Sequence, residues 1–303
     1  MSFNYKAILK SLWWILVLCF IGFFLIGNIN RVEAVIQQLS IATIIYSISA
    51  LSLGKLFLVA IMHQSLQRYQ IEFSVQRCFY IYNLTQLGKY IPGSIWQFVG
   101  RIGLYKEAGL RNHAIRDTLL LETFWVVSSA FLLGLFLICI THYEMLISIF
   151  LLLTNALLIL ISSVAFIIVL IVIAGPWRNK ILSYSPRLIY TPASLLIVLF
   201  IWIFLGLSFW VTLLPFSNTE IGLVYIIGLY AFSYAAGFVV PFAPAGIGIR
   251  ESVLVFGLTP YLDTNTSIIL ATLNRMFYIA IEIILAAAAL KLSNKPRMEE
   301  PIQ

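Results

Sequence analysis

Long, mostly apolar runs alternate with short polar segments along the whole chain. The runs of close to 20 residues or more cover residues 11–29, 40–62, 118–140, 146–174, 193–214, 222–240 and 266–290. About 20 apolar residues in a helix are enough to cross the ~30 Å hydrocarbon core of a bilayer. The pattern therefore predicts an all-α polytopic membrane protein with about six to eight transmembrane helices.

Two apolar regions are interrupted by Pro and Gly, and each interruption ends in Arg. The first break is GKYIPGSIWQFVGR at residues 88–101, and the second break is FVVPFAPAGIGIRE at residues 238–251. Irregular backbone is tolerated within hydrocarbon only where it is buried in protein or lines a wet cavity, because lipid offers its N–H and C=O groups no partner. We therefore expect the two breaks to line a cavity.

Composition supports a membrane setting. Hydrophobic residues make up 61% of the chain and charged residues only 10%, with a mean hydropathy of +0.99, whereas about a quarter of the residues in soluble domains are charged. A soluble enzyme is excluded. We expect a single integral membrane domain over residues 1–292 and a short cytoplasmic tail over residues 293–303.

The basic residues predict how the chain is oriented. Lys and Arg are concentrated in residues 63–117, 175–192 and the C-terminal tail, whereas residues 141–145 and 215–222 contain none. By the positive-inside rule, both termini then lie in the cytoplasm. The number of crossings agrees with this orientation if residues 71–110 and 222–260 form re-entrant hairpins that enter from opposite faces. Such an inverted arrangement is typical of transporters. Residues 222–240 are also long enough to cross, so that alternative stays open.

The first break has the residue types of an anion site. Pro and Gly end one helix, and a new helix starting near Ser94 would point N–H groups and a positive dipole end at a ligand flanked by Lys89 and Arg101. The alternative is an amphipathic segment on the cytoplasmic surface that contacts lipid headgroups. The candidate site residues here are Lys89, Pro92, Gly93, Ser94, Trp96 and Arg101.

The second break places an Arg–Glu pair within an otherwise apolar stretch. Two unpaired charges there would cost several kcal/mol, so Arg250 or Glu251 is expected to face a partner or a ligand. A guanidinium beside a helix start suits a phosphate or phosphodiester, which accepts bidentate bonds. An interhelical salt bridge is the alternative. The candidate residues are Pro244, Gly246, Gly248, Arg250 and Glu251.

Three further charged residues fall inside the predicted spans and are also candidates. Arg275 is central to the last span, Glu282 lies two turns beyond it, and Glu122 is expected to pair with an arginine. Lys55 is interpreted as an anchor that snorkels to the cytoplasmic surface. Cys19, Cys78 and Cys139 lack metal-ligand spacing, so we expect neither a metal nor another cofactor.

Four sequence blocks resemble, in order and spacing, the lysylphosphatidylglycerol synthase transmembrane-region family. The blocks are GKYIPGSIWQFVGR, RDTLLLETFWV, FVVPFAPAGIGIRES and LNRMFYIAIE. The positions that match the family's Pro-Gly and Gly-rich elements are Pro92, Gly93, Arg101, Pro244, Gly246, Gly248, Arg250 and Glu251. Ala245 departs from the more usual Gly, and Ser94 replaces a residue that is often basic.

The resemblance implies a stand-alone flippase-like protein of the bacterial cytoplasmic membrane, without the aminoacyl transferase domain of the synthases. Its expected partner is an anionic phospholipid or a polyprenyl-phosphate-linked glycan, translocated during cell-envelope biogenesis. A membrane transferase acting on a lipid-linked substrate is an alternative, although the sequence has no HExxH, P-loop or nucleotide fingerprint. A non-transporting scaffold subunit of an envelope polysaccharide or lipid biosynthesis complex is another. The +7 charge follows from membrane topology and does not imply nucleic-acid binding.

Overall fold

A computed structural model describes residues 27, 29–91, 95–142, 190–216, 221–240 and 243–293. All regular secondary structure in these ranges is helical. Four helices there are long and apolar enough to cross a membrane: Ile41–Arg68, Asn112–Thr141, Pro192–Phe216 and Thr264–Leu292. They coincide with the predicted spans at 40–62, 118–140, 193–214 and 266–290. An all-α membrane protein is therefore confirmed for this part of the chain. The predicted span at 146–174 and nearly all of the span at 11–29 lie outside the described residues.

The long helices are α3 (Ile41–Arg68), α6 (Asn112–Thr141), α10 (Pro192–Leu213, continued by η2, Leu214–Phe216) and α13 (Thr264–Ser293), with the short α2 (Ile29–Gln38) preceding them. Polar caps fix where these helices begin. The Ser40 hydroxyl accepts the Thr43 N–H at 3.0 Å before α3, and the Thr191 hydroxyl accepts the Ser194 N–H at 3.1 Å before α10. Such caps satisfy N–H groups that have no partner within the helix.

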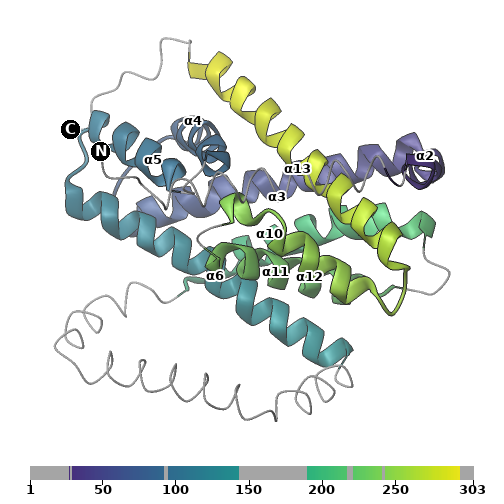
Figure 1. The fold of residues 1–303 in the computed structure, drawn as a ribbon. Coiled ribbons are helices and arrows are strands. Elements are labelled where there is room, and N and C mark those ends of the chain that lie inside the picture. The colour runs from purple at the N-terminus through teal and green to yellow at the C-terminus, as the bar shows by residue number, and fades with distance from the viewer. Residues whose placement is uncertain are drawn as a thin grey trace, which may run out of the picture.

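Both breaks are built from short helices. We take each break from here on together with its flanking helices. The first then comprises α4 (Val75–Gln86), η1 (Leu87–Tyr90) and α5 (Trp96–Glu107), and the second comprises α11 (Leu223–Val239), η3 (Pro244–Gly246) and α12 (Ile249–Leu258). The twelve residues of α4 or α5 extend only about 18 Å, so neither helix can cross a ~30 Å core alone. In Figure 1, α11 and α12 lie between the long helices α6 and α13.

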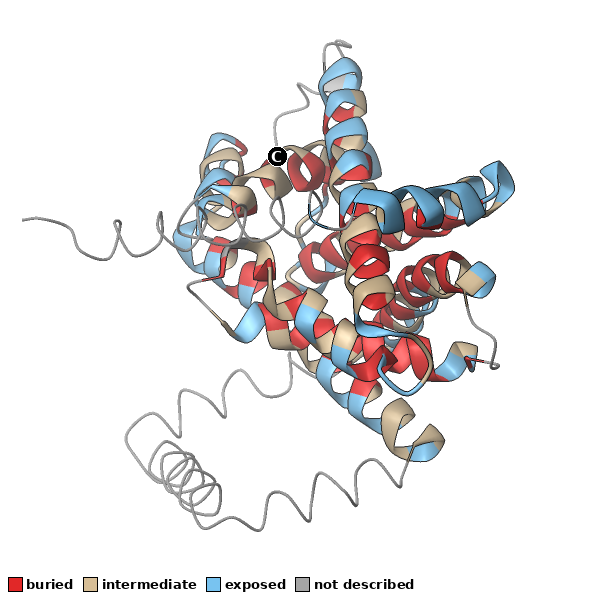
Figure 2. Ribbon diagram, turned by 45° about the vertical axis from the view of Figure 1, so that its right-hand side comes forward, coloured by how far each residue is buried: buried red, intermediate tan, exposed pale blue. Residues whose placement is uncertain are grey.

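The bundle packs most extensively where α3 meets α10 and where α6 meets α11. Small residues allow the second contact to be close: a Cβ added to Gly134 on α6 would lie 2.6 Å from the Phe232 backbone nitrogen on α11. Close backbone approach through glycine is typical of helices that associate in membranes. Buried residues face the inside of this bundle, and exposed residues cover its outer faces (Figure 2).

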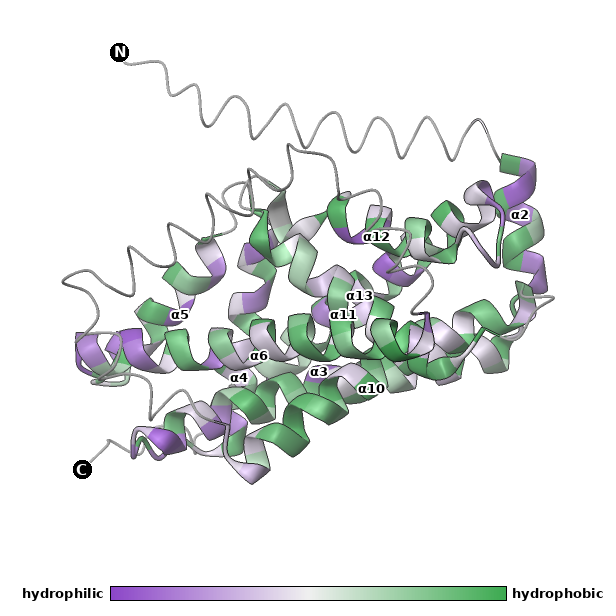
Figure 3. Cartoon of the chain, turned by 90° about the horizontal axis from the view of Figure 1, so that it is seen from below, coloured by the Kyte–Doolittle hydropathy of each residue, from purple (hydrophilic) through white to green (hydrophobic). Residues whose placement is uncertain are grey.

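Large apolar side chains cover much of the outer surface. On α6, for example, Leu132 and Phe136 are 61% and 59% exposed. Hydrophobic residues continue along the long helices in Figure 3, as expected for helices that are surrounded by lipid. Inside this apolar shell, η1 contacts both η3 and α13. The two breaks, which lie about half the chain apart in sequence, therefore meet in space.

Candidate functional site

A partly open cavity of about 220 Å³ lies where the two breaks meet. The first break contributes Gln86, Lys89, Ile95, Gln97 and Phe98 to its lining. The second break contributes Tyr234, Gly237, Phe238, Val240, Ala243, Ala245, Gly246 and Arg250. The expectation that both breaks line a cavity is therefore met, and it is one cavity that they share.

Glycines let the second break turn back against α11. Gly246 and Gly248 have φ values of +69° and +87°, and Ala245 has a φ of 53°, a region that side chains with a Cβ rarely occupy. A Cβ on Gly246 would lie 2.8 Å from the Gly237 Cα, and one on Gly237 would lie 2.5 Å from the Arg250 Cγ. Without side chains at these positions, Arg250 can cross α11 and reach the cavity.

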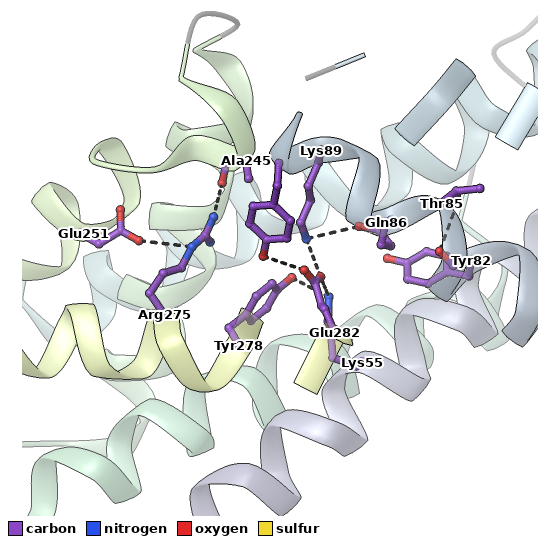
Figure 4. Close-up of polar contacts among 11 residues, drawn as sticks. Lys55, Tyr82, Thr85, Gln86, Lys89, Ala245, Glu251, Arg275, Tyr278 and Glu282 are labelled. Atoms are coloured by element: carbon purple, nitrogen blue, oxygen red, sulfur yellow. Dashed lines mark hydrogen bonds and ion pairs between the residues drawn. The ribbon is translucent and has the colours of Figure 1, made fainter. Parts of the chain in front are cut away.

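Glu251 and Arg275 hold the second break through contacts with its backbone. Glu251 accepts the Gly248 N–H at 2.7 Å and so caps the start of α12. Its other oxygen lies 3.7 Å from the Arg275 Nε, and the Arg275 Nη2 donates to the Ala245 carbonyl oxygen at 2.7 Å. Figure 4 shows the contacts of Arg275 with Glu251 and with Ala245. The alternative of an interhelical salt bridge thus holds for Glu251, whose partner is Arg275, and not for Arg250.

Glu282 on α13 is the common acceptor for groups from two other elements. The ammonium groups of Lys55 on α3 and Lys89 on η1 both donate to its Oε1, with Lys89 at 2.5 Å, and the Tyr90 hydroxyl donates to its Oε2 at 2.7 Å. Lys55 also donates to the Tyr278 hydroxyl at 2.9 Å.

The interpretation of Lys55 as a snorkelling anchor is wrong. Its side chain is only 1% exposed, because α13 places the Glu282 carboxylate beside it in the interior. A lysine snorkels when no counter-charge lies within reach, and here one does. This pairing could not be predicted from the sequence, because Lys55 and Glu282 are far apart along the chain.

Tyr278 on α13 lies among four cations. The charged groups of Lys55, Lys89, Arg250 and Arg275 are 4.1, 4.9, 5.2 and 5.6 Å from the centre of its ring. We define the Tyr278 cluster as Tyr278, Lys55, Lys89, Arg250, Arg275, Glu251 and Glu282. Its four cations face two carboxylates, which leaves a surplus of two formal positive charges in a buried region.

Arg250 carries much of that surplus. Its guanidinium lies 5.3 and 5.0 Å from the rings of Tyr230 and Tyr234 on α11, and it makes no ion pair within the described residues. Stacking on aromatic faces stabilises a guanidinium but does not neutralise it. Arg250 and Lys89, the two cluster cations that line the cavity, therefore present positive charge to it.

Arg101 on α5 is directed elsewhere. Its Nη1 donates to both oxygens of Glu122 on α6 at 2.6 and 2.8 Å, and its guanidinium lies 4.8 Å from the ring of Tyr82. The expectation that Glu122 pairs with an arginine is met. The structure does not bring Arg101 to the 220 Å³ cavity beside Lys89, because Arg101 lines a separate pocket of about 40 Å³.

Of the remaining candidate residues, some lie in described helices and some lie outside the described residues. Trp96 is 46% exposed at the first residue of α5. The backbone of Pro244 begins η3, whereas Pro92, Gly93 and Ser94 lie outside the described residues. No group of His, Cys, Asp and Glu in the described ranges could hold a metal ion.

The sequence analysis missed the tyrosines of the site. Tyr278 follows Arg275 by three residues and precedes Glu282 by four, a spacing that places all three on one helix face. Tyr230 and Tyr234 are likewise one turn apart on α11. A search for aromatic residues at helical spacing from intramembrane charges would have found them.

The arrangement can hold an anion of phosphate size between Arg250, Lys89 and the start of α5. It contains no nucleophile–base pair among the described groups that contact the cavity. Comparison of the sequence with known protein families and with curated proteins finds no match in either case.

Proposed function

We propose that this protein binds the phosphate-bearing headgroup of an anionic lipid in the cavity between the two breaks and moves the lipid between leaflets. The observation that carries the proposal is the positive surplus of the Tyr278 cluster, which reaches the cavity through Arg250 and Lys89. Buried charge without a full set of partners is expensive in a membrane protein and marks ligand sites.

The size of the cavity favours a headgroup over a larger ligand. Its volume of about 220 Å³ is smaller than the ~300–1,000 Å³ of pockets that enclose drug-sized ligands. A phosphate group fits in this space, whereas acyl or polyprenyl chains do not. The chains would therefore stay in the surrounding bilayer while the headgroup occupies the cavity.

The cavity offers three kinds of phosphate contact. Arg250 supplies a planar guanidinium that can donate two parallel bonds, and Lys89 supplies a point charge. The first turn of α5 adds a third, because its N-cap residue Ile95 has no side-chain acceptor for the N–H groups of that turn and itself lines the cavity. A bound phosphate would compete with Glu282 for Lys89.

Topology and resemblance support the same function. The short α4, α5 and α12 suit two re-entrant hairpins in an inverted arrangement, with both termini in the cytoplasm. The four blocks that resemble the lysylphosphatidylglycerol synthase transmembrane region favour a bacterial cytoplasmic membrane and a role in cell-envelope biogenesis. In this proposal the substrate is a phospholipid or a polyprenyl-phosphate-linked glycan.

The test is leaflet exchange in liposomes that contain the purified protein. Labelled phosphatidylglycerol and, separately, a labelled polyprenyl-phosphate sugar would be followed with wild type, Arg250→Ala and Arg250→Lys. We expect one lipid to move with wild type, Arg250→Ala to abolish the movement and Arg250→Lys to retain part of it. Lys291→Ala, an exposed change at the end of α13, is the control and should move lipid as wild type does.

The failure of this proposal would be clear. Size-exclusion profiles would first establish that each variant is folded. If folded wild type moved neither lipid, or if Arg250→Ala moved lipid normally, the headgroup site would be wrong. Turnover of a sugar-nucleotide donor would then indicate a transferase, and a stoichiometric protein partner would indicate a scaffold subunit.

A further inference from the structure

A second hollow, separate from the headgroup cavity, lies between α5 and α6. It has a volume of about 470 Å³, more than twice that of the cavity. Its walls include the apolar side chains of Ile102, Leu119 and Leu120, and Leu120 is 56% exposed. We infer that this α5/α6 groove is the loading site of the same anionic lipid, and that it holds the lipid's hydrocarbon chain before the headgroup enters the cavity. The inference rests on the proposed function.

The length of the groove fits one leaflet. Its α6 wall runs from Asn112 to Thr123, the first three turns of the helix. That stretch rises about 17 Å, close to half of the ~30 Å hydrocarbon thickness. A chain lying along it would therefore extend from the surface of the bilayer to near the midplane.

Charge at the groove matches an anionic lipid. Lys106 and Arg116 both line it, and both belong to the segment 63–117, in which Lys and Arg are concentrated. The Arg116 Nε donates to Asp117 at 2.8 Å, so that charge is balanced, whereas Lys106 makes no ion pair within the described residues. Lys106 is thus the basic group on this wall whose charge would meet a lipid phosphate.

The 40 Å³ pocket lies between the groove and the headgroup cavity and shares lining residues with both. Phe98 borders all three hollows, and Thr123 is shared by the groove and the pocket. The pocket is lined by polar groups, among them Gln86, Gln97 and the Arg101–Glu122 pair. Because about 40 Å³ is close to the volume of one water molecule, the pocket would have to widen to let the headgroup pass, and its polar walls suit a headgroup and not the hydrocarbon chain, which stays in the groove.

The experiment is photo-crosslinking with phosphatidylglycerol that carries a photoreactive group in its acyl chain. The protein in liposomes would be irradiated, and labelled peptides of α5 and α6 would be identified by mass spectrometry. We expect labelling to concentrate at the groove residues of wild type. Lys106→Gln should reduce that labelling about fivefold, which corresponds to the ~1 kcal/mol that one basic residue contributes near an anionic membrane surface.

Leu120→Trp fills the groove and should reduce labelling and lipid movement together. Leu132→Trp is its matched control, because Leu132 is exposed on the same helix and lies outside the groove lining. Excess unlabelled phosphatidylglycerol should compete with the probe, and glycerol phosphate should not. Equal competition by glycerol phosphate would overturn the assignment, because the acyl chain of the lipid would then contribute nothing to binding in the groove.

The outcomes separate this inference from the proposed function. If labelling at the groove were no stronger than around Leu132 while lipid still moved, the loading site would be wrong and the headgroup site in the cavity would remain supported. If the groove were labelled but lipid never moved, the groove would stand as a lipid site and translocation would be wrong. Arg250→Ala should leave groove labelling at the wild-type level.

Discussion

The Arg101–Glu122 pair and the Tyr278 cluster are both buried sets of charges at the breaks, but they differ in how completely those charges are balanced. Arg101 donates to both oxygens of Glu122 and is 3% exposed, so one cation meets one anion in a closed pair. The Tyr278 cluster combines four cations with two carboxylates and borders a cavity. The comparison separates charges that hold helices together from charges that are available to a ligand.

The same difference shows in the unsatisfied groups. In the Tyr278 cluster, the Nε and Nη1 of Arg275 are buried without a hydrogen-bond partner among the described residues. The Arg101 guanidinium has the carboxylate, Thr85 at 3.4 Å and the face of Tyr82. Buried polar groups are usually satisfied, and exceptions concentrate at functional sites. Four sets of substitutions test the comparison.

Glu282→Gln should have the largest effect. The change removes the charge that both buried lysines share, and breaking a buried ion pair from one side costs about 3–5 kcal/mol. We expect a large fall in thermal unfolding temperature in detergent. Lys55→Met added to Glu282→Gln should recover part of the loss, because it removes one uncompensated charge. A single substitution with wild-type stability would show that the lysines do not depend on Glu282.

The Arg101–Glu122 pair should be replaceable as a unit. Arg101→Met with Glu122→Leu exchanges both charges for apolar groups of similar length, and such exchanges are often neutral within a few kcal/mol. Arg101→Met alone should be less stable than the double variant, since it leaves a buried carboxylate unpaired. A double-mutant cycle of unfolding free energies measures the coupling. If the double variant were the least stable of the set, the pair would be more than a structural contact.

Asp263 gives the exposed counterpart of these buried charges. It precedes α13, accepts the N–H groups of Asn265 and Thr266 at 3.1 Å each, and lies 3.7 Å from Arg31. Asp263→Ala should cost about 1 kcal/mol as the loss of a helix cap, whereas Arg31→Gln should change stability by no more than the ~0.5 kcal/mol typical of an exposed ion pair.

The same residue predicts a pH dependence. Hydrogen bonding from Thr266 holds the pKa of Asp263 below its ordinary value of 3.8. The charged form is therefore favoured by folding, so its contribution is complete above pH 3.8 and is lost as the pH falls through the lowered pKa. Unfolding temperatures of wild type and Asp263→Ala should converge in acid. A constant gap between them would rule out this titration.

Ala245→Gly should have the smallest effect, and it should be stabilising. Ala245 has a φ of 53°, where glycine avoids a strain of about 1 kcal/mol and loses part of that gain through the greater freedom of its unfolded chain. We expect a net gain of roughly 0.5 kcal/mol by these opposing terms. The measurement is a denaturant midpoint compared with that of Ala243→Gly, whose backbone φ is not positive.

The sequence predicted the features that depend on local pattern. Helical spans follow from apolar runs, and the two breaks follow from Pro and Gly between them. It could not show that η1 and η3 meet, because that contact depends on how α4, α11 and α13 pack. For the same reason Lys55 was misread, and the sequence could not show that Arg275, a candidate site residue, donates to the backbone of Ala245. Glu122 was paired correctly because an intramembrane carboxylate needs a nearby cation.

Glu282 joins Lys55 on α3, and Lys89 and Tyr90 on η1, to α13 through a single carboxylate. Displacement of η1 would break two of these bonds at once and leave only the bond donated by Lys55 on α3. We therefore expect η1 and the middle of α13 to open locally with the same free energy of opening. Their backbone amides should exchange hydrogen for deuterium as a single cooperative unit. Occupancy of the cavity would then be readable as slower exchange in both segments together.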